Sequence, residues 1–117
     1  MFDKLVDAIF NIDPLIRYVA IVDKTGERLE GGIRREKMSL NPPEEEPRMF
    51  MQTAISRGMV DSWSKYFSNY NFSIISYKNV ILLLFPFQEN NLLVTMEPSA
   101  SLDDAGKILD LAQEHAR

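Results

Sequence analysis

The hydrophobic positions of the chain gather in three short runs between residues 71 and 97. The middle run, at 80–87, is the most apolar and contains Pro86, which removes a hydrogen bond and clashes inside a helix. Polar breaks at 78–79 and 88–91 separate the runs, and their asparagines tolerate the positive backbone angles of tight turns. Apolar runs of this length between turn residues predict three strands joined by hairpins.

The first of these strands, at 72–77, has mixed faces. Phe72 and Ile74 point to one side, whereas Ile75 and Tyr77 point to the other. A strand with two partly apolar faces suits the edge of a sheet, where it offers unpaired backbone groups to another chain. The pattern therefore predicts an edge strand that pairs with a second molecule.

The N-terminal part of the chain, residues 2–32, predicts one helix followed by two strands. Residues 2–12 are apolar at helical spacing and predict a short amphipathic helix. Residues 17–22 are rich in strand formers. The segment 23–26 begins with Asp and ends with Gly, which favours a type I turn into a polar strand at 27–30. We expect Gly31 and Gly32 to end that strand.

A long irregular stretch, at about 34–47, is acidic and contains prolines. Connections of this length are usually functional or mobile. Arg34, Arg35 and Lys37 are candidates for contacting phosphate or an acidic partner, and a solvated loop tip is the alternative. The glutamates at 44–46 suit the start of a helix better than a cation site, because negative charge is favourable there and consecutive carboxylates do not converge.

Residues 48–67 predict the longest helix. Met51, Ile55, Met59 and Trp63 form a stripe at helical spacing, and other apolar residues widen it beyond one face. Such a helix needs two apolar partners, its own sheet and a second surface. Trp63 is therefore interpreted as interface, with core as the alternative. Gly58 in mid-helix suggests that another element approaches closely.

A final helix follows Ser101, which with Asp104 resembles a capping box. The predicted order is therefore α-β-β-α-β-β-β-α. This order favours a single α+β domain over residues 1–117, with three helices packed on a five-stranded antiparallel sheet.

The composition excludes several classes of function. The chain of 117 residues has no cysteine, a net charge of −4 and one histidine, His115, near its C-terminus. Disulfides and thiolate sites are excluded, and a reducing compartment such as the cytoplasm is expected. The charge gives no reason to expect nucleic acid, and no apolar run approaches the ~20 residues that span a bilayer. Without a catalytic or metal-binding motif, we expect no enzyme activity, cofactor or metal.

Several stretches resemble the roadblock/LC7 domain, a relative of longin and profilin-like folds. Residues 18–26 look like the opening hairpin of that family, a hydrophobic strand followed by Asp-x-x-Gly, and residues 79–97 look like its last two strands. A set of small archaeal proteins with this architecture is also similar, at residues 12–14, 16–17, 31–32, Arg34 and 97–98. The acidic, proline-containing loop departs from typical members.

The resemblance implies a homodimer, or a dimer with a paralogous roadblock-type subunit, built by the third strand and the second helix. It also implies a scaffold or a regulator of a small GTPase, without an active site. The residues expected in the dimer interface are Met51, Ile55, Met59, Trp63, Phe72, Ile74, Ile75 and Tyr77.

Two other functions remain open on the sequence. A small-molecule sensor of profilin/PAS-like type would need a cavity between sheet and helices, lined by residues such as Phe72, Phe85 and Met59. An enzyme would need a convergent set of ionisable groups, and the sequence shows none.

Overall fold

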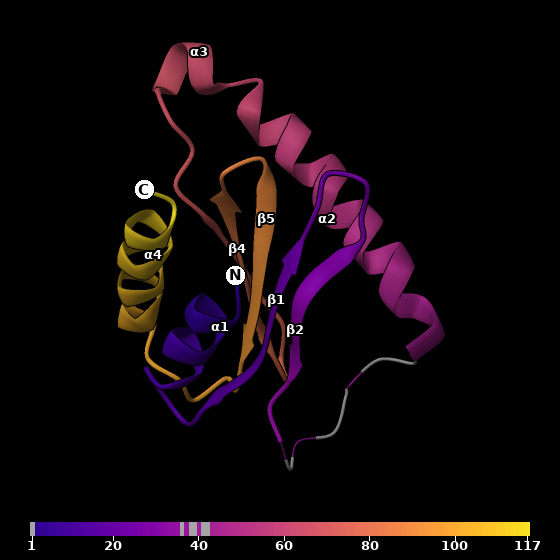
Figure 1. Cartoon of the computed structure of the whole chain (residues 1–117), viewed down its shortest axis with the longest axis vertical. Coiled ribbons are helices and arrows are strands. Elements are labelled where there is room, and N and C mark those ends of the chain that lie inside the picture. Colours follow the sequence, from indigo (N-terminus) through magenta and orange to yellow (C-terminus); the bar gives the residue numbers. More distant parts are fainter. Residues whose placement is uncertain (1, 36, 38–39, 41–42) are drawn as a thin grey trace.

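A computed structural model describes residues 2–35, 37, 40 and 43–117, and it confirms the α+β class and the predicted order of elements (Figure 1). One five-stranded antiparallel sheet has the order β2-β1-β5-β4-β3. Its strands are β1 (Ile16–Val22), β2 (Arg28–Ile33), β3 (Ser73–Ser76), β4 (Ile81–Phe87) and β5 (Asn90–Met96). The order leaves β2 and β3 at the two edges, and β3 is thus an edge strand as predicted.

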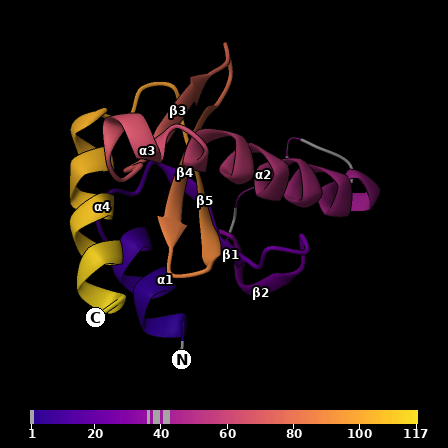
Figure 2. The ribbon, with the colours of Figure 1, turned by 90° about the horizontal axis from the view of Figure 1, so that it is seen from above.

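Helices lie on both faces of the sheet. Figure 2 shows α1 (Asp3–Phe10) and α4 (Asp103–His115) on one face and α2 (Glu46–Asp61) on the other. The expected helix at 48–67 is two helices, because the chain turns after α2 before α3 (Ser64–Phe67). The expected loop at 34–47 lies partly outside the described residues, and its end forms a 3₁₀ turn, η1 (Pro43–Glu45), that leads into α2.

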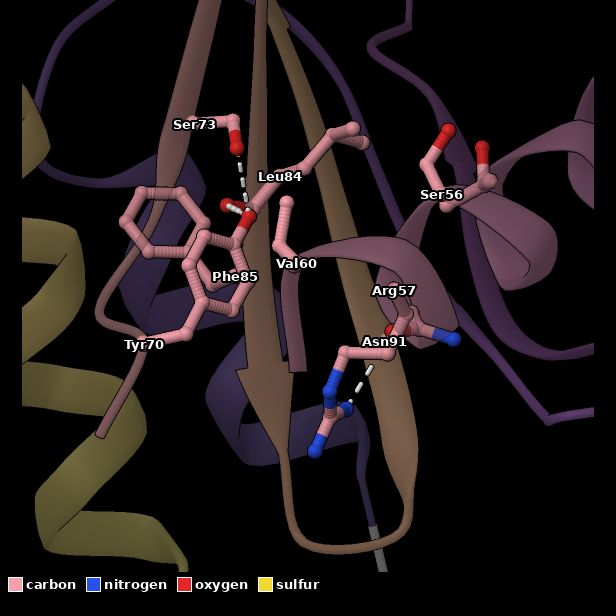
Figure 3. Close-up of a pocket in the computed structure, with 9 residues that line it drawn as sticks. Ser56, Arg57, Val60, Tyr70, Ser73, Leu84, Phe85 and Asn91 are labelled. Carbon is pink, nitrogen blue, oxygen red and sulfur yellow. Dashed lines mark hydrogen bonds between the residues drawn. The ribbon is translucent and has the colours of Figure 1, made fainter. Parts of the chain in front are cut away.

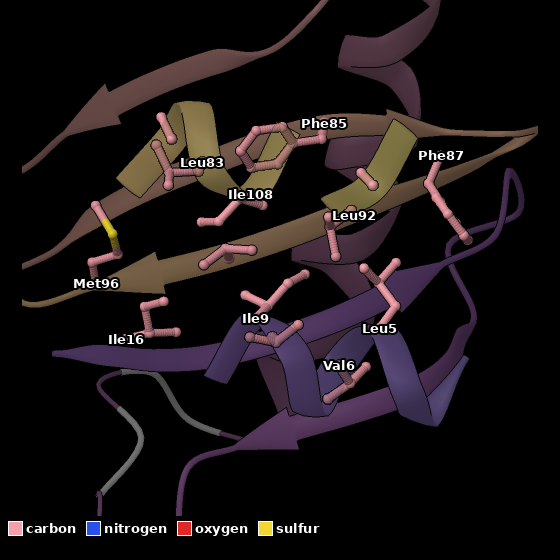
Figure 4. Close-up of a cluster of buried hydrophobic side chains, with 14 of the residues drawn as sticks. Leu5, Val6, Ile9, Ile16, Leu83, Phe85, Phe87, Leu92, Met96 and Ile108 are labelled. Carbon is pink, nitrogen blue, oxygen red and sulfur yellow. The ribbon is translucent and has the colours of Figure 1, made fainter. Parts of the chain in front are cut away.

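The main core lies between the sheet and the helices α1 and α4 (Figure 4). Leu5 and Ile9 of α1 and Ile108 of α4 are almost fully buried. They pack on the alternate residues of the strands that point to this face, among them Leu83 and Phe85. The helical spacing of the two helices and the period of two in the strands thus converge on one apolar layer.

The opposite face of the sheet carries a much smaller core. It consists of Ala20, Val22 and Leu93 of the sheet together with Phe50 of α2. The structure describes every residue of α2, and Phe50 is the only one of them that is buried. Figures 1 and 2 show that α2 crosses the strands obliquely and that its N-terminal end stands away from them. The longest helix therefore buries little of its apolar surface within this chain.

Two expectations about glycines are wrong. Gly31 and Gly32 lie inside β2 rather than ending it, and a Cβ at Gly31 would come within 2.0 Å of the Val19 carbonyl oxygen. Glycine is required there because of this close backbone approach and a φ of +102°. Gly58, by contrast, has no atom within 4 Å of its Cβ position, so no other element approaches it among the described residues.

Candidate interaction surface

Large apolar side chains are exposed along the side of α2 that faces away from the sheet and on α3. Their exposed fractions lie between 46 and 77%, and the residues are Met51, Ile55, Met59, Trp63, Tyr66 and Phe67. The spacing of four residues places Met51, Ile55 and Met59 along one stripe of α2, and Trp63 follows in the turn before α3. Trp63 is 54% exposed, so it is not a core residue of the single chain. A contiguous apolar surface of this kind is typical of an interaction site.

The edge strand β3 adds apolar side chains on both of its faces. It pairs with β4 alone among the described strands, so its outer backbone groups face away from the sheet. Ile75 lies opposite Leu82, which points toward α2, whereas Ile74 lies opposite Leu83 in the main core. Both isoleucines are 40% exposed. Ile75 therefore shares a face of the sheet with α2.

Phe72 differs from the other residues expected at the interface. Its ring packs against Phe85 at a centroid distance of 5.5 Å, and it covers the margin of the main core. Met59 is exposed on α2 and does not belong to the main core. These three residues therefore do not line a common cavity, because two of them pack in the core and the third lies on the surface.

Arg57 attaches the C-terminal half of α2 to the sheet. Its guanidinium donates to the Asn90 carbonyl at 2.7 Å and to the Asn91 side-chain oxygen at 3.2 Å, and it pairs with Asp61 at 2.9 Å. Both asparagines are buried at the start of β5, where the sequence had predicted a turn. Figure 3 shows Arg57 reaching from α2 toward Asn91. Phe50 and Arg57 thus fix α2 at two points along its length.

A very small cavity lies beside Arg57 (Figure 3), between α2 and the strands β4 and β5. On the side of the cavity away from Arg57, the Tyr70 hydroxyl donates to the Leu84 carbonyl at 3.1 Å and shares a hydrogen bond with the Ser73 hydroxyl at 2.7 Å. The volume of about 20 Å³ has room for about one water molecule, so it is not a ligand site.

A much larger groove, the α2 groove, opens between the N-terminal half of α2 and the sheet. Its volume is about 490 Å³, and it is lined by Arg17, Tyr18, Arg28, Ile33, Leu40, Glu46, Met49, Phe50, Tyr77, Asn79, Val80, Leu82, Leu93 and Thr95. A bulge in β1, where the register against β5 shifts between Ile16 and Tyr18, lets both Arg17 and Tyr18 reach it. The groove exists because α2 stands away from the strands.

Polar contacts join the two walls of the α2 groove. The Tyr18 hydroxyl donates to Glu46 at 2.8 Å, and Arg28 pairs with the same carboxylate at 3.3 Å. Burial, with the hydrogen bond to Glu46 as a smaller cause, raises the pKa of Tyr18, so this phenol remains a neutral donor. Arg17 pairs with Glu97 at 2.7 Å, and Lys37 pairs with it at 3.1 Å.

The three cations expected to contact a partner have different surroundings. Arg34 donates to the carbonyls of Ile16, Phe10 and Asp13 at 2.6, 2.7 and 2.9 Å, so it serves to hold the corner between α1 and β1. Its use inside the fold conflicts with the expected role in partner binding. Lys37 is tied to Glu97, and Arg35 is exposed.

A buried carboxyl group at the start of α4 was missed by the sequence analysis. Asp104 is 3% exposed, and its Oδ2 atom has no hydrogen-bond partner. Burial, followed by the hydrogen bond to Asp13, raises the pKa of Asp104 to about 6. The expected capping box forms only in part: the Ser101 hydroxyl accepts the Asp103 N–H at 3.2 Å, whereas Asp104 turns toward Asp13.

The described residues contain no group of three or more histidine, cysteine or acidic side chains that could hold a metal ion. Within the same residues, no helix combines the length and apolarity needed to cross a bilayer.

Comparison with solved structures identifies the fold of this chain. The sequence matches no protein-family model and no curated protein. Among solved structures, a roadblock/LC7 domain from Streptomyces avermitilis matches with a TM-score of 0.71 at 12% identity, over 96% of this chain and 92% of that one. The chain therefore has the roadblock/LC7 fold, and the resemblance seen in the sequence is confirmed at the level of fold.

Two further structures agree with this assignment. MglB from Myxococcus xanthus has a TM-score of 0.75 at 13% identity, over 98% of this chain and 91% of that one. The gliding protein MglB from Thermus thermophilus has a TM-score of 0.72 at 15% identity, over 96% and 88% of the two chains. At these identities the likeness shows the fold alone.

Proposed function

We propose that this protein is a non-enzymatic interaction module that works as a dimer, with itself or with another roadblock-type subunit. The observation that carries the proposal is the exposed apolar stripe of α2 together with the exposed isoleucines of the edge strand β3. Both elements leave apolar surface that a single chain does not bury. Pairing through β3 would also satisfy its outer backbone groups.

One of the matched structures supports an assembly of such chains. It is described as MglB with a tetrameric arrangement and has a TM-score of 0.74 at 16% identity, over 98% of this chain and 89% of that one. Within the proposal, the dimer acts as a scaffold or as a regulator of a small GTPase in the cytoplasm. Arg35 is exposed and stays a candidate contact for such a partner.

Sedimentation of the purified chain tests the proposal. We expect a dimer at micromolar concentration and a folded monomer for Ile75→Lys, since a lysine there places a charge in the apolar contact. The matched control is Leu102→Lys, which changes an exposed apolar residue before α4 on the opposite face. A monomeric wild type, or a dimer that both substitutions leave intact, would contradict the proposal.

A second measurement addresses catalysis. Purified protein, assayed alone with nucleoside triphosphates, is expected to show no turnover. Hydrolysis that follows the protein through purification would overturn the non-enzymatic assignment.

A further inference from the structure

We propose that the α2 groove binds a small monoanionic amphiphile, an extended apolar chain that ends in a single carboxylate. The site lies between α2 and the face of the sheet under it, and the apolar stripe residues of α2 do not line it. The inference goes beyond the proposed function and does not depend on it, since a monomer would present the same groove.

The size and walls of the groove suit the apolar part of such a ligand. Its volume of about 490 Å³ lies within the roughly 300–1,000 Å³ of pockets for small molecules. Leu82 and Leu93 form part of the sheet wall, and Met49 and Phe50 form part of the helix wall. Burying an alkyl chain between these walls removes its methylenes from water, which favours binding.

The polar groups at the groove favour one negative charge on the ligand. Among the described residues, three cations (Arg17, Arg28 and Lys37) surround two carboxylates (Glu46 and Glu97) at and beside the groove. The surplus is one positive charge, which matches a single carboxylate.

Arg28 is the residue placed to receive the ligand head. Its guanidinium carries five N–H donors, and it interacts with Glu46 and with the Tyr18 hydroxyl on the helix side. The side chain is 42% exposed at the groove, so a carboxylate can approach it from solvent. Glu46 also accepts the Tyr18 hydroxyl, which reduces its repulsion of a second carboxylate. The planar fork of arginine suits a carboxylate in particular.

Calorimetric titration with decanoate tests the assignment on the full chain. We expect saturable binding to the wild type and at least tenfold weaker binding to Arg28→Leu, because a hydrogen bond to a charged group is lost. Decanol, which has the same chain without the charge, should bind at least tenfold more weakly than decanoate. The matched control is Arg48→Leu, which changes an exposed arginine of α2 outside the groove and should leave binding unchanged.

Thr95→Phe gives an independent variant, because an aromatic side chain suits a strand and fills the sheet wall. It should abolish decanoate binding while circular dichroism and the melting transition show a folded protein. Sedimentation of Arg28→Leu should match the wild type, which separates this test from that of the dimer.

Three results would overturn the inference. These are no saturable decanoate binding to the wild type, equal losses for Arg28→Leu and Arg48→Leu, and equal affinities for decanoate and decanol. Binding that appears only in the monomeric Ile75→Lys variant would also overturn it, because a second copy of the chain would then occupy the groove.

Discussion

The carboxyl groups of Asp13 and Asp104 share a hydrogen bond that joins the corner before β1 to the first turn of α4. Asp13 also accepts the Leu15 N–H at 2.9 Å. The Asp104 hydrogen bond and then the Leu15 N–H lower the pKa of Asp13, while burial raises that of Asp104 to about 6. The two groups therefore hold one proton between them in mildly acidic solution.

This pair predicts a pH dependence of stability. The folded pKa of Asp104 lies above its ordinary value of 3.8, so the folded state binds more protons than the unfolded state between about pH 4 and 6. The stabilisation from protonated Asp104 is thus present near pH 4 and is lost as the pH rises through 6. The contribution of Asp13 has the opposite sign and is lost as the pH falls below 4, because its pKa is lowered.

Asp104→Asn should isolate the effect of Asp104. The amide keeps the shape of the protonated acid and donates to Asp13, so the substitution should raise the melting temperature at pH 7.5 and change it little at pH 4.5. Thermal melts at both pH values measure this, with Asp103→Asn as the exposed neighbour control. An equal shift at both pH values would contradict a role for proton binding.

Arg57→Leu should loosen α2 selectively. The substitution removes the hydrogen bonds to Asn90 and Asn91 and leaves their buried oxygens without this donor, at a cost of about 1.5–3 kcal/mol. Hydrogen exchange should accelerate in α2 and remain unchanged in α1 and α4, which pack on the other face. Arg48→Leu serves as the control on the same helix, since Arg48 is exposed. Uniform acceleration in all helices would show that Arg57 supports the whole fold.

Arg34→Ala should destabilise the chain far more than Arg35→Ala. Arg34 satisfies three backbone carbonyls at the corner between α1 and β1, and its guanidinium lies 4.8 Å from the centre of the Phe10 ring. Losing these contacts should lower the free energy of unfolding by about 2–4 kcal/mol. Arg35→Ala should change it by less than about 0.5 kcal/mol, as for exposed residues. Urea denaturation of both variants gives the comparison, and equal effects would contradict the structural role of Arg34.

The sequence predicted those elements whose apolar pattern depends only on residues close together in the chain. Apolar runs predicted β1, β3, β4 and β5, the turn at 23–26 predicted the polar strand β2, and the mixed faces of residues 72–77 identified the edge, because the period of a strand reports burial directly. Gly31 was misread for the opposite reason. Its need for glycine comes from the Val19 backbone on the neighbouring strand, a contact that residues in sequence order do not reveal.

The candidate surface was predicted only in part. The stripe from Met51 to Trp63 is visible at helical spacing, but its outward direction depends on how Phe50 and Arg57 attach α2 to the sheet. The α2 groove depends on the tilt of that helix and on a bulge in β1, neither of which has a sequence signature. Phe72 is a large apolar residue beside the edge strand and was therefore expected at the interface, but its ring packs against Phe85 at the margin of the core.

Trp63 is the single tryptophan of the chain and offers a direct measurement of the proposed contact. It is 54% exposed in the isolated chain, so its emission should be that of a solvated indole in the monomer. If the stripe of α2 is buried between two copies, dilution through the dissociation range should shift the emission to the red and increase quenching by acrylamide.

The Ile75→Lys variant should show the emission of the diluted protein at every concentration, because β3 and α2 contribute to one contact. Leu102→Lys should follow the wild type. If sedimentation shows dissociation while the emission stays constant, the two copies meet without α2. The apolar stripe would then have to be assigned to a different partner, and β3 alone would carry the self-association.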